Sequence, residues 1–197
     1  DKGAKLRSGF SQQITPKEYK ERIHNSTITD VLQEYDIHSG DVFYIPAGRV
    51  HSIGAGAFIA EIQETSNITY RIFDFNRKDA NGNARELHTE LAKDAIDYEV
   101  LDDYRTDYES VKDEPVELVA CPYFTTSLYD LTENITCDYS ELDSFIVLIC
   151  MEGDCKIVTN EGHEITMKKG ETILLAASTE DITIIPDGTA KLLETYV

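Results

Sequence analysis

The second half of the chain constrains the fold most, because short apolar segments follow one another closely from residue 116 to the C-terminus. We predict strands at 116–124, 127–131, 144–151, 156–159, 163–167, 172–176, 182–185 and 191–196. The turns between them are expected at Gly153, 160–162, 169–170 and 186–188. Short strands with such regular punctuation indicate a β-sandwich or a β-barrel.

The first half mixes strand and helix signals. A strand is predicted at 6–10, and a helix follows to about His24, with Thr15 as N-cap, Pro16 in the first turn and Glu18 completing a capping box. Further helices are predicted at 28–33 and 85–93, and further strands at 42–45, 58–63 and 69–75. The expected fold class is all-β with a helical insert in the first half.

A change of composition marks the expected domain boundary. Residues 98–115 are acidic and poor in apolar clusters. We therefore expect a first domain at 1–98, an acidic linker at 99–115 and a second domain at 116–197.

Composition limits the partners and the compartment. The net charge is -19, which argues against nucleic acid or an anionic membrane as the main partner but leaves small anionic substrates possible. The four cysteines form no CxxC pair, so reduced thiols are favoured. No apolar run approaches about 18 residues and no signal-peptide pattern opens the chain, so a cytoplasmic location is expected.

The segment from Gly40 to His51 carries the strongest chemical signal. A strand that stops at Pro46, a tight turn at Gly48 and a returning strand from His51 would form a hairpin. Such a hairpin would place the imidazole near the inner face of a small barrel, where other metal ligands can converge. The alternative is a histidine that is satisfied by hydrogen bonds within the turn.

Two stretches resemble a known family. The spacing Gly-x5-Pro-x-Gly-x2-His, from Gly40 to His51, is similar to the second signature of the cupin superfamily, in which the histidine ligates a metal. That signature usually has Asn four residues later, where this chain has Ala55. Residues 46–56 and 61–71 resemble the bacterial type I mannose-6-phosphate isomerases nearly residue for residue. The resemblance extends along the whole chain but is specific only over 40–77.

The resemblance implies a fold, a cofactor and a reaction. The fold would be a double-stranded β-helix (cupin, or jelly roll): an N-terminally truncated first cupin and a complete second cupin. The second cupin would be metal-free, since residues 176–180 replace the expected Pro and His. The reaction would be the zinc-dependent interconversion of mannose 6-phosphate and fructose 6-phosphate through an enediol. One zinc ion is implied, with its other ligands N-terminal to Asp1, so this chain alone is expected to be inactive and, with sheet edges uncovered, to self-associate.

Four residues receive roles from the resemblance. His51 matches a zinc ligand, Arg71 an arginine of the sugar site, Arg77 a basic residue near the substrate phosphate, and Glu61 a candidate proton-transfer base. Their plainer interpretations are a solvent-exposed Glu61 and a solvated turn at Arg77.

Other readings remain open for Arg71 and for the whole chain. Arg71 could form a surface ion pair with Asp74. For the protein, the alternatives are a non-catalytic cupin module that binds a sugar or sugar phosphate, and a different cupin enzyme such as an oxygenase or epimerase.

Overall fold

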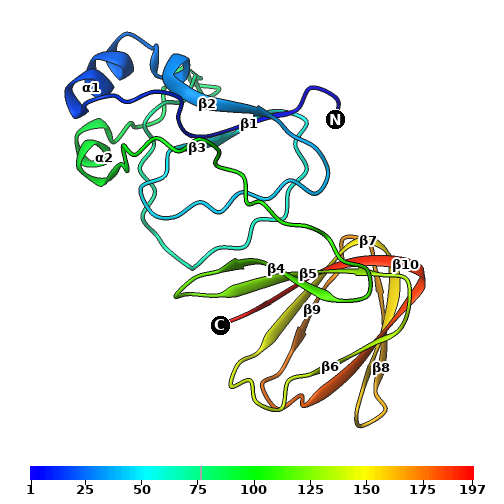
Figure 1. The fold of residues 1–197 in the computed structure, drawn as a ribbon. Helices are drawn as coiled ribbons and strands as arrows, with labels where there is room; N and C mark the ends of the chain where they lie inside the picture. The colour runs from blue at the N-terminus through cyan, green and yellow to red at the C-terminus, as the bar shows by residue number, and fades with distance from the viewer. Residues whose placement is uncertain (76) are drawn as a thin grey trace. The chain divides into compact units, whose positions relative to one another are not determined.

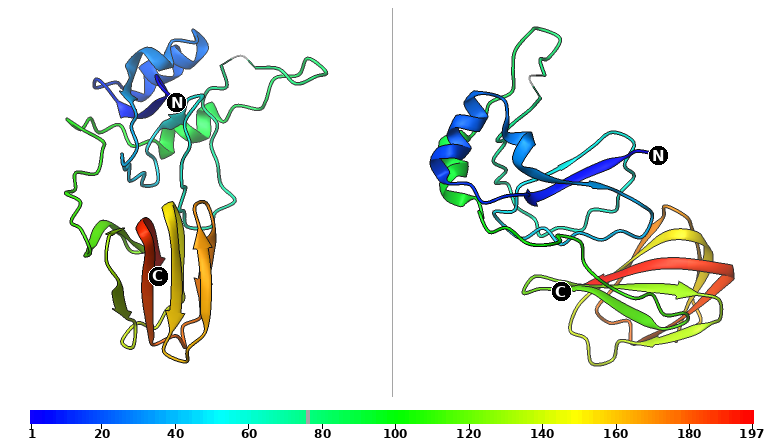
Figure 2. Two further views of the ribbon diagram at one scale, coloured as in Figure 1. Left: turned by 90° about the vertical axis from the view of Figure 1, so that its right-hand side faces the viewer. Right: turned by 45° about the horizontal axis from the view of Figure 1, so that its top comes forward.

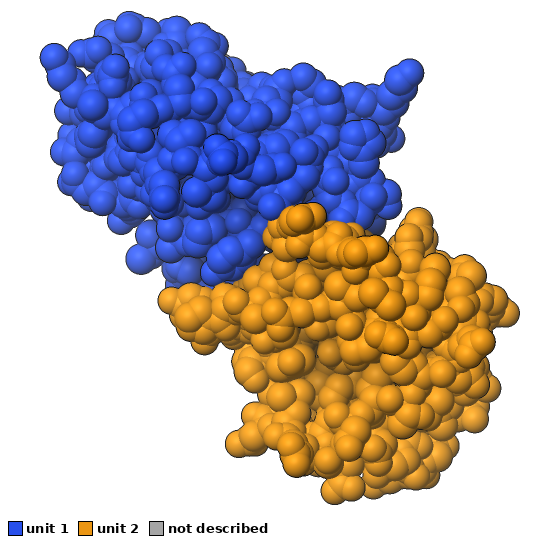
Figure 3. All heavy atoms as spheres, viewed as in Figure 1, with its two compact units in different colours: residues 1–105 blue, residues 106–197 orange. Residues whose placement is uncertain are grey.

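The computed structural model describes residues 1–75 and 77–197 and divides into two compact units, 1–105 and 106–197 (Figures 1 and 3). The division lies within the acidic segment 99–115. All four cysteines are free thiols, as the sequence predicted. Cys137, Cys150 and Cys155 are buried, whereas Cys121 is only partly buried. No helix of the described residues is both long enough and apolar enough to cross a membrane.

The first unit is built on a small antiparallel sheet. The elements of this unit are β1 (Lys5–Phe10), α1 (Pro16–His24), the 3-10 turn η1 (Ile28–Val31), β2 (Leu32–Asp36), β3 (His51–Ile53) and α2 (Thr89–Ala95). The strand order is β2-β1-β3. Helix α1 starts as predicted: the Thr15 hydroxyl accepts from the Glu18 N–H at 3.2 Å, and the Glu18 carboxylate accepts from the Thr15 N–H at 2.7 Å.

Three predicted strands of the first unit are wrong, because their apolar residues serve other contacts. Segment 42–45 is not a strand, and its Phe43 ring instead packs edge-on against Tyr35 with centroids 5.1 Å apart. Segment 58–63 has no strand partner in the described chain and leaves Phe58 83% exposed. In segment 69–75, the backbone of Arg71 forms hydrogen bonds with His88 and not with a neighbouring strand. Residues 54–75 and 77–88 consequently run as long loops (Figure 2).

Two predicted helices are shorter than expected. Residues 28–31 form only a 3-10 turn, after which the chain enters β2. Helix α2 begins only at Thr89. The residue before it, His88, donates its backbone N–H to the Arg71 carbonyl at 2.8 Å, and this bond holds the preceding segment outside the helix.

The core of the first unit joins the sheet to both helices and to residues 96–104. Buried members are Phe10, Ile14, Tyr19, Ile28, Val31, Val50 and Ala92. The hydroxyl of Tyr104 accepts from the Phe10 N–H at 3.1 Å and donates to the Phe10 carbonyl at 3.0 Å. Its ring lies against Gly9, where an added Cβ would fall 2.1 Å from a ring carbon. Residue 9 must therefore be glycine, and Tyr104 is part of this unit's core.

The second unit is a β-sandwich that shares two long strands between its faces (Figure 2). The strands of this unit are β4 (Pro115–Ala120), β5 (Thr125–Leu131), β6 (Ile135–Asp138), β7 (Ile146–Thr159), β8 (Glu164–Lys168), β9 (Thr172–Leu175) and β10 (Asp181–Tyr196). In β10, residues 190–196 pair with β5 and with residues 146–153 of β7. Earlier in the strand, residues 181–184 pair with β6 and residues 182–186 pair with residues 155–159 of β7. The all-β expectation is confirmed.

Two predicted turns of this unit are wrong. Gly153 lies inside β7, and residues 186–188 lie inside β10, at a shift in their pairing between Pro186 and Ala190. Such bulges bend a strand without ending it, which lets one strand serve both faces of the sandwich. Gly153 has φ +70, and a Cβ there would lie 2.0 Å from the Thr189 carbonyl oxygen. Strand β6 was not predicted.

The core of the second unit is continuous and almost entirely apolar. Its eight largest fully buried side chains are Leu131, Ile146, Leu148, Ile157, Met167, Ile182, Ile184 and Leu192. One carboxyl group interrupts it. Glu194 is 4% exposed, and one of its oxygens accepts hydrogen bonds from Tyr129 at 3.1 Å and from Tyr139. Burial raises the pKa of Glu194, because the charged carboxylate loses its solvation by water.

Candidate functional site

His51 is the first residue of β3, directly after a tight turn. The strand pairs with β1, so that His51 stands opposite Ser8. In the turn, the Arg49 N–H donates to the Pro46 carbonyl at 3.1 Å, and Gly48 adopts φ +88. The predicted turn and the start of the strand at His51 are thus observed, although β3 pairs with β1 and not with residues 42–45.

The imidazole of His51 is exposed and oriented by its own turn. Its Nδ1 lies 3.1 Å from the Arg49 carbonyl oxygen. Since a carbonyl can only accept, Nδ1 carries the proton of the neutral ring, and Nε2 of that tautomer keeps the lone pair. This is the arrangement in which a histidine ligates a metal through one nitrogen while the other is held by a backbone carbonyl. The hydrogen-bonded turn and the ligand role are therefore compatible.

Arg49 anchors this turn and was missed by sequence reasoning. Its side chain is only 8% exposed, its guanidinium lies 4.6 Å from the centroid of the Tyr104 ring, and it pairs with Asp97 at 3.7 Å. The neighbouring Gly48 carbonyl accepts from the Asp97 N–H at 3.0 Å. A buried arginine between Gly48 and His51 cannot be recognised from the motif, because both of its partners lie about fifty residues away in the sequence.

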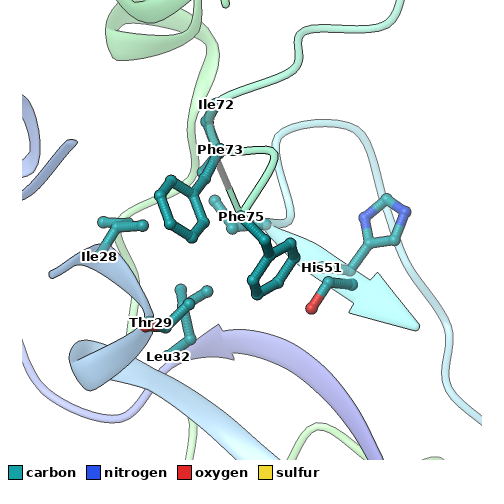
Figure 4. Close-up of a pocket in the computed structure, with 9 residues that line it drawn as sticks. Ile28, Thr29, Leu32, His51, Ile72, Phe73 and Phe75 are labelled. Carbon is teal, nitrogen blue, oxygen red and sulfur yellow. The ribbon is translucent and has the colours of Figure 1, made fainter. Parts of the chain in front are cut away.

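A small hollow beside β3 is mainly apolar. Its lining residues are Ile28, Thr29, Leu32, Val50, His51, Ser52, Ile72, Phe73 and Phe75. Figure 4 shows the phenyl rings of Phe73 and Phe75 beside Leu32, while the His51 ring points away from them. Because its lining offers few polar groups, this hollow is not by itself a sugar site.

Arg71 is half-buried and held by the segment that precedes α2. Its backbone N–H donates to Nδ1 of His88 at 3.0 Å, and its guanidinium donates to the Glu86 carbonyl at 3.3 Å. Among the described contacts it forms no ion pair with Asp74, so the plainer interpretation of Arg71 is not what the structure shows.

Asp74 instead lies between two other arginines. Its side chain is 8% exposed and forms ion pairs with Arg77 and, at 3.6 Å, with Arg85. The Arg77 side chain remains 65% exposed. The backbone N–H of Arg77 and its side-chain Nε–H both donate to the Asp74 carbonyl oxygen. Arg77 is therefore a fixed cation open to solvent, which suits an anionic group of a small molecule.

Glu61 has no such support. It is exposed in the loop that follows β3, and within the described residues it makes no hydrogen bond or ion pair. The structure thus fixes His51, Arg71 and Arg77 by named contacts, whereas Glu61 is free to reorient.

The donor set for a metal is incomplete in this part of the chain. Across residues 1–75 and 77–197, no group of three or more His, Cys, Asp or Glu side chains could hold an ion. Protein zinc sites need three or four protein ligands. His51 fits the role of one ligand, and the described residues do not supply the others.

Comparisons with known proteins define the class of the second unit first. Residues 115–197 match the family described as "Mannose-6-phosphate isomerase, cupin domain". The β-sandwich is therefore a cupin domain, and the predicted cupin fold class is confirmed.

The same comparisons extend to the whole chain. It is 30% identical over 163 residues to mannose-6-phosphate isomerase ManA of Bacillus subtilis, covering 82% of this chain and 51% of that protein. A mannose-6-phosphate isomerase of Streptococcus mutans is 27% identical over 176 residues, covering 89% and 54%. The crystal structure of the Bacillus subtilis mannose 6-phosphate isomerase superposes with a TM-score of 0.85 at 26% identity, covering 100% of this chain and 62% of that one.

The chain is therefore similar in sequence and structure to mannose-6-phosphate isomerases, as the sequence resemblance indicated. The phosphomannose isomerase of Salmonella typhimurium, with a TM-score of 0.64 at 17% identity over 94% of this chain and 47% of its own, shares the fold. The chain spans about half the length of the curated relatives it matches.

Proposed function

We propose that the protein is a mannose-6-phosphate isomerase and that residues 1–197 supply part of its active site. The observation that carries the proposal is His51, exposed at the start of β3 with Nδ1 held at 3.1 Å by the Arg49 carbonyl and Nε2 left for a ligand. It lies in the stretch that resembles the isomerases most. The further ligands of a zinc ion would come from outside residues 1–197.

Each proposed role follows from the chemistry of the side chain. Zinc, when bound, would supply Lewis-acid polarisation of the sugar carbonyl. Arg71 would stabilise the negative charge that develops as a proton moves between adjacent carbons through an enediol, since a guanidinium stays protonated. Glu61 would carry that proton, for which an unconstrained carboxylate must first be oriented by the substrate. Arg77 would hold the phosphate away from the reacting carbons.

Isomerase activity of the full-length gene product tests this proposal. With zinc and mannose 6-phosphate, we expect fructose 6-phosphate to form, and His51→Ala and Arg71→Ala to lower kcat/KM at least about 100-fold. The matched control is His24→Ala, an exposed histidine at the end of α1, which should leave the rate unchanged. A zinc-loaded full-length protein that binds the sugar phosphate without converting it would support the non-catalytic binding module instead.

The remaining roles have their own variants. Arg77→Ala should raise KM more than it lowers kcat, whereas Arg85→Ala, which shares Asp74 but has no proposed substrate contact, should change neither by more than about twofold. Residues 1–197 alone should bind zinc weakly and be inactive. Stoichiometric zinc on this chain with His51 among the ligands would contradict that expectation.

A further inference from the structure

The backbone of Arg71 is held on both sides by one residue. His88 accepts the Arg71 N–H through Nδ1 at 3.0 Å and donates its own N–H to the Arg71 carbonyl at 2.8 Å. Two residues earlier, the Glu86 carbonyl accepts from the Arg71 guanidinium at 3.3 Å. Segment 86–88 thus fixes Arg71 at its N–H, its carbonyl and its side chain.

The ring of His88 is used for this purpose and not for its own helix. His88 is the N-cap of α2, yet its side chain makes no capping bond to the helix. Its carbonyl does start α2, accepting from the Ala92 N–H at 2.8 Å, and Ala92 is only 1% exposed in the core. Because Nδ1 must carry a lone pair to accept from Arg71, the proton of the neutral ring is on Nε2. His88 therefore links Arg71 to an element that is anchored in the core.

We propose that His88 is a positioning residue for Arg71, an inference that rests on the proposed isomerase function and deepens it. The guanidinium itself has one hydrogen bond among the described contacts, so the accuracy of its placement depends on the backbone from which it projects. A displacement of about 1 Å in a catalytic group can lower a rate about 100-fold. His88 holds that backbone without touching the substrate.

Two variants separate the acceptor from the ring. His88→Phe keeps a flat ring that can pack near Tyr70, whose centroid lies 6.0 Å from that of His88, but removes the acceptor. His88→Asn loses the ring but places an amide oxygen at the same number of bonds from Cα as Nδ1. In the zinc-loaded full-length protein we expect His88→Phe to lower kcat about tenfold with KM nearly unchanged, and His88→Asn to restore most of it.

A double-mutant cycle shows whether the effect passes through Arg71. In an Arg71→Ala background the backbone bonds to residue 88 remain, but there is no guanidinium to position. His88→Phe should then change the residual rate by less than about twofold. An equal tenfold loss in both backgrounds, full activity of His88→Phe, or failure of Asn to restore activity would each overturn the proposal.

A measurement without turnover keeps this inference separate from the proposed function. Hydrogen exchange of the Arg71 amide, followed in residues 1–197, should be slow in the natural sequence and in His88→Asn, and at least about tenfold faster in His88→Phe. Fast exchange in all three would overturn the proposed bond. If the full-length protein fails to isomerise while this exchange pattern is found, the failure belongs to the enzymatic proposal alone.

Discussion

The two units of this chain differ in how completely they bury their apolar residues. The second unit shares its two longest strands, β7 and β10, between both faces and buries a continuous apolar core. The first unit has a three-stranded sheet and carries residues 54–75 and 77–88 as long loops, with Phe58 83% and Ile68 71% exposed. All four proposed site residues belong to the first unit. The proposed site residues therefore lie in β3 and in the loops of the less regular unit, whereas the closed sandwich contains none of them.

The largest expected contrast is between core and loop side chains. Leu192→Ala, at a fully buried position of β10, should lower the free energy of unfolding by about 2–5 kcal/mol. Phe58→Ala, which removes a larger but exposed side chain, should change it by less than about 0.5 kcal/mol. Urea denaturation followed by circular dichroism measures both. A similar cost at Phe58 would show that the loops of the first unit are buried against something, and would break the comparison.

A smaller effect tests the shared strands of the second unit. Gly153→Ala should cost about 2–3 kcal/mol, because φ is +70 and the new Cβ would meet the Thr189 carbonyl oxygen. Gly162→Ala is the matched control: its φ is +82 but nothing lies within 4 Å, so only the conformational cost of about 1 kcal/mol should remain. Thermal melting of the two variants should differ accordingly. Equal melting temperatures would mean that β7 does not pass so close to β10.

The smallest expected effect depends on pH and concerns the one carboxyl in the second core. Burial raises the pKa of Glu194 in the folded protein. The stabilisation that comes with the protonated carboxyl is therefore complete below the ordinary carboxyl pKa, and it is lost as the pH rises through the pKa of the folded state. Glu194→Gln keeps an acceptor for Tyr129 and Tyr139 and should stabilise the protein by about 1 kcal/mol at neutral pH, but not at acid pH.

The exposed Glu133→Gln provides the control for that measurement, because it makes the same change of charge outside the core. A gain for Glu194→Gln that is equal at every pH would contradict the linkage, because the difference must disappear where both states bind the proton.

The sequence predicts helix starts and turns correctly where the residues that cause them are close together in the chain. The capping box of α1 and the tight turn at Gly48 involve residues within a few positions of one another, and both are present. The continuity of β7 through Gly153 was missed, because a glycine that marks a turn and one that permits a bulge look alike until the partner strand is known. Strand propensity at 58–63 likewise says nothing about whether a partner strand is available.

For the candidate site as well, the residues could be named from the sequence but the contacts around them could not. His51, Glu61, Arg71 and Arg77 were chosen from a resemblance to known sequences, and their roles stay predictions. The contacts that hold them could not be foreseen, because Arg49 depends on Tyr104 and Arg71 on His88, pairs that are joined only by tertiary structure.

The position of Tyr104 has a practical consequence for anyone who wishes to produce the first unit by itself. A gene fragment that ends at residue 98, where the composition first changes, would delete the phenol ring that lies against Gly9. It would leave a void beside β1 and strip the Phe10 N–H and carbonyl of their shared partner. Arg49 would lose the aromatic surface beneath its guanidinium at the same time. A fragment extended to residue 105 keeps all of these contacts and is the one to clone.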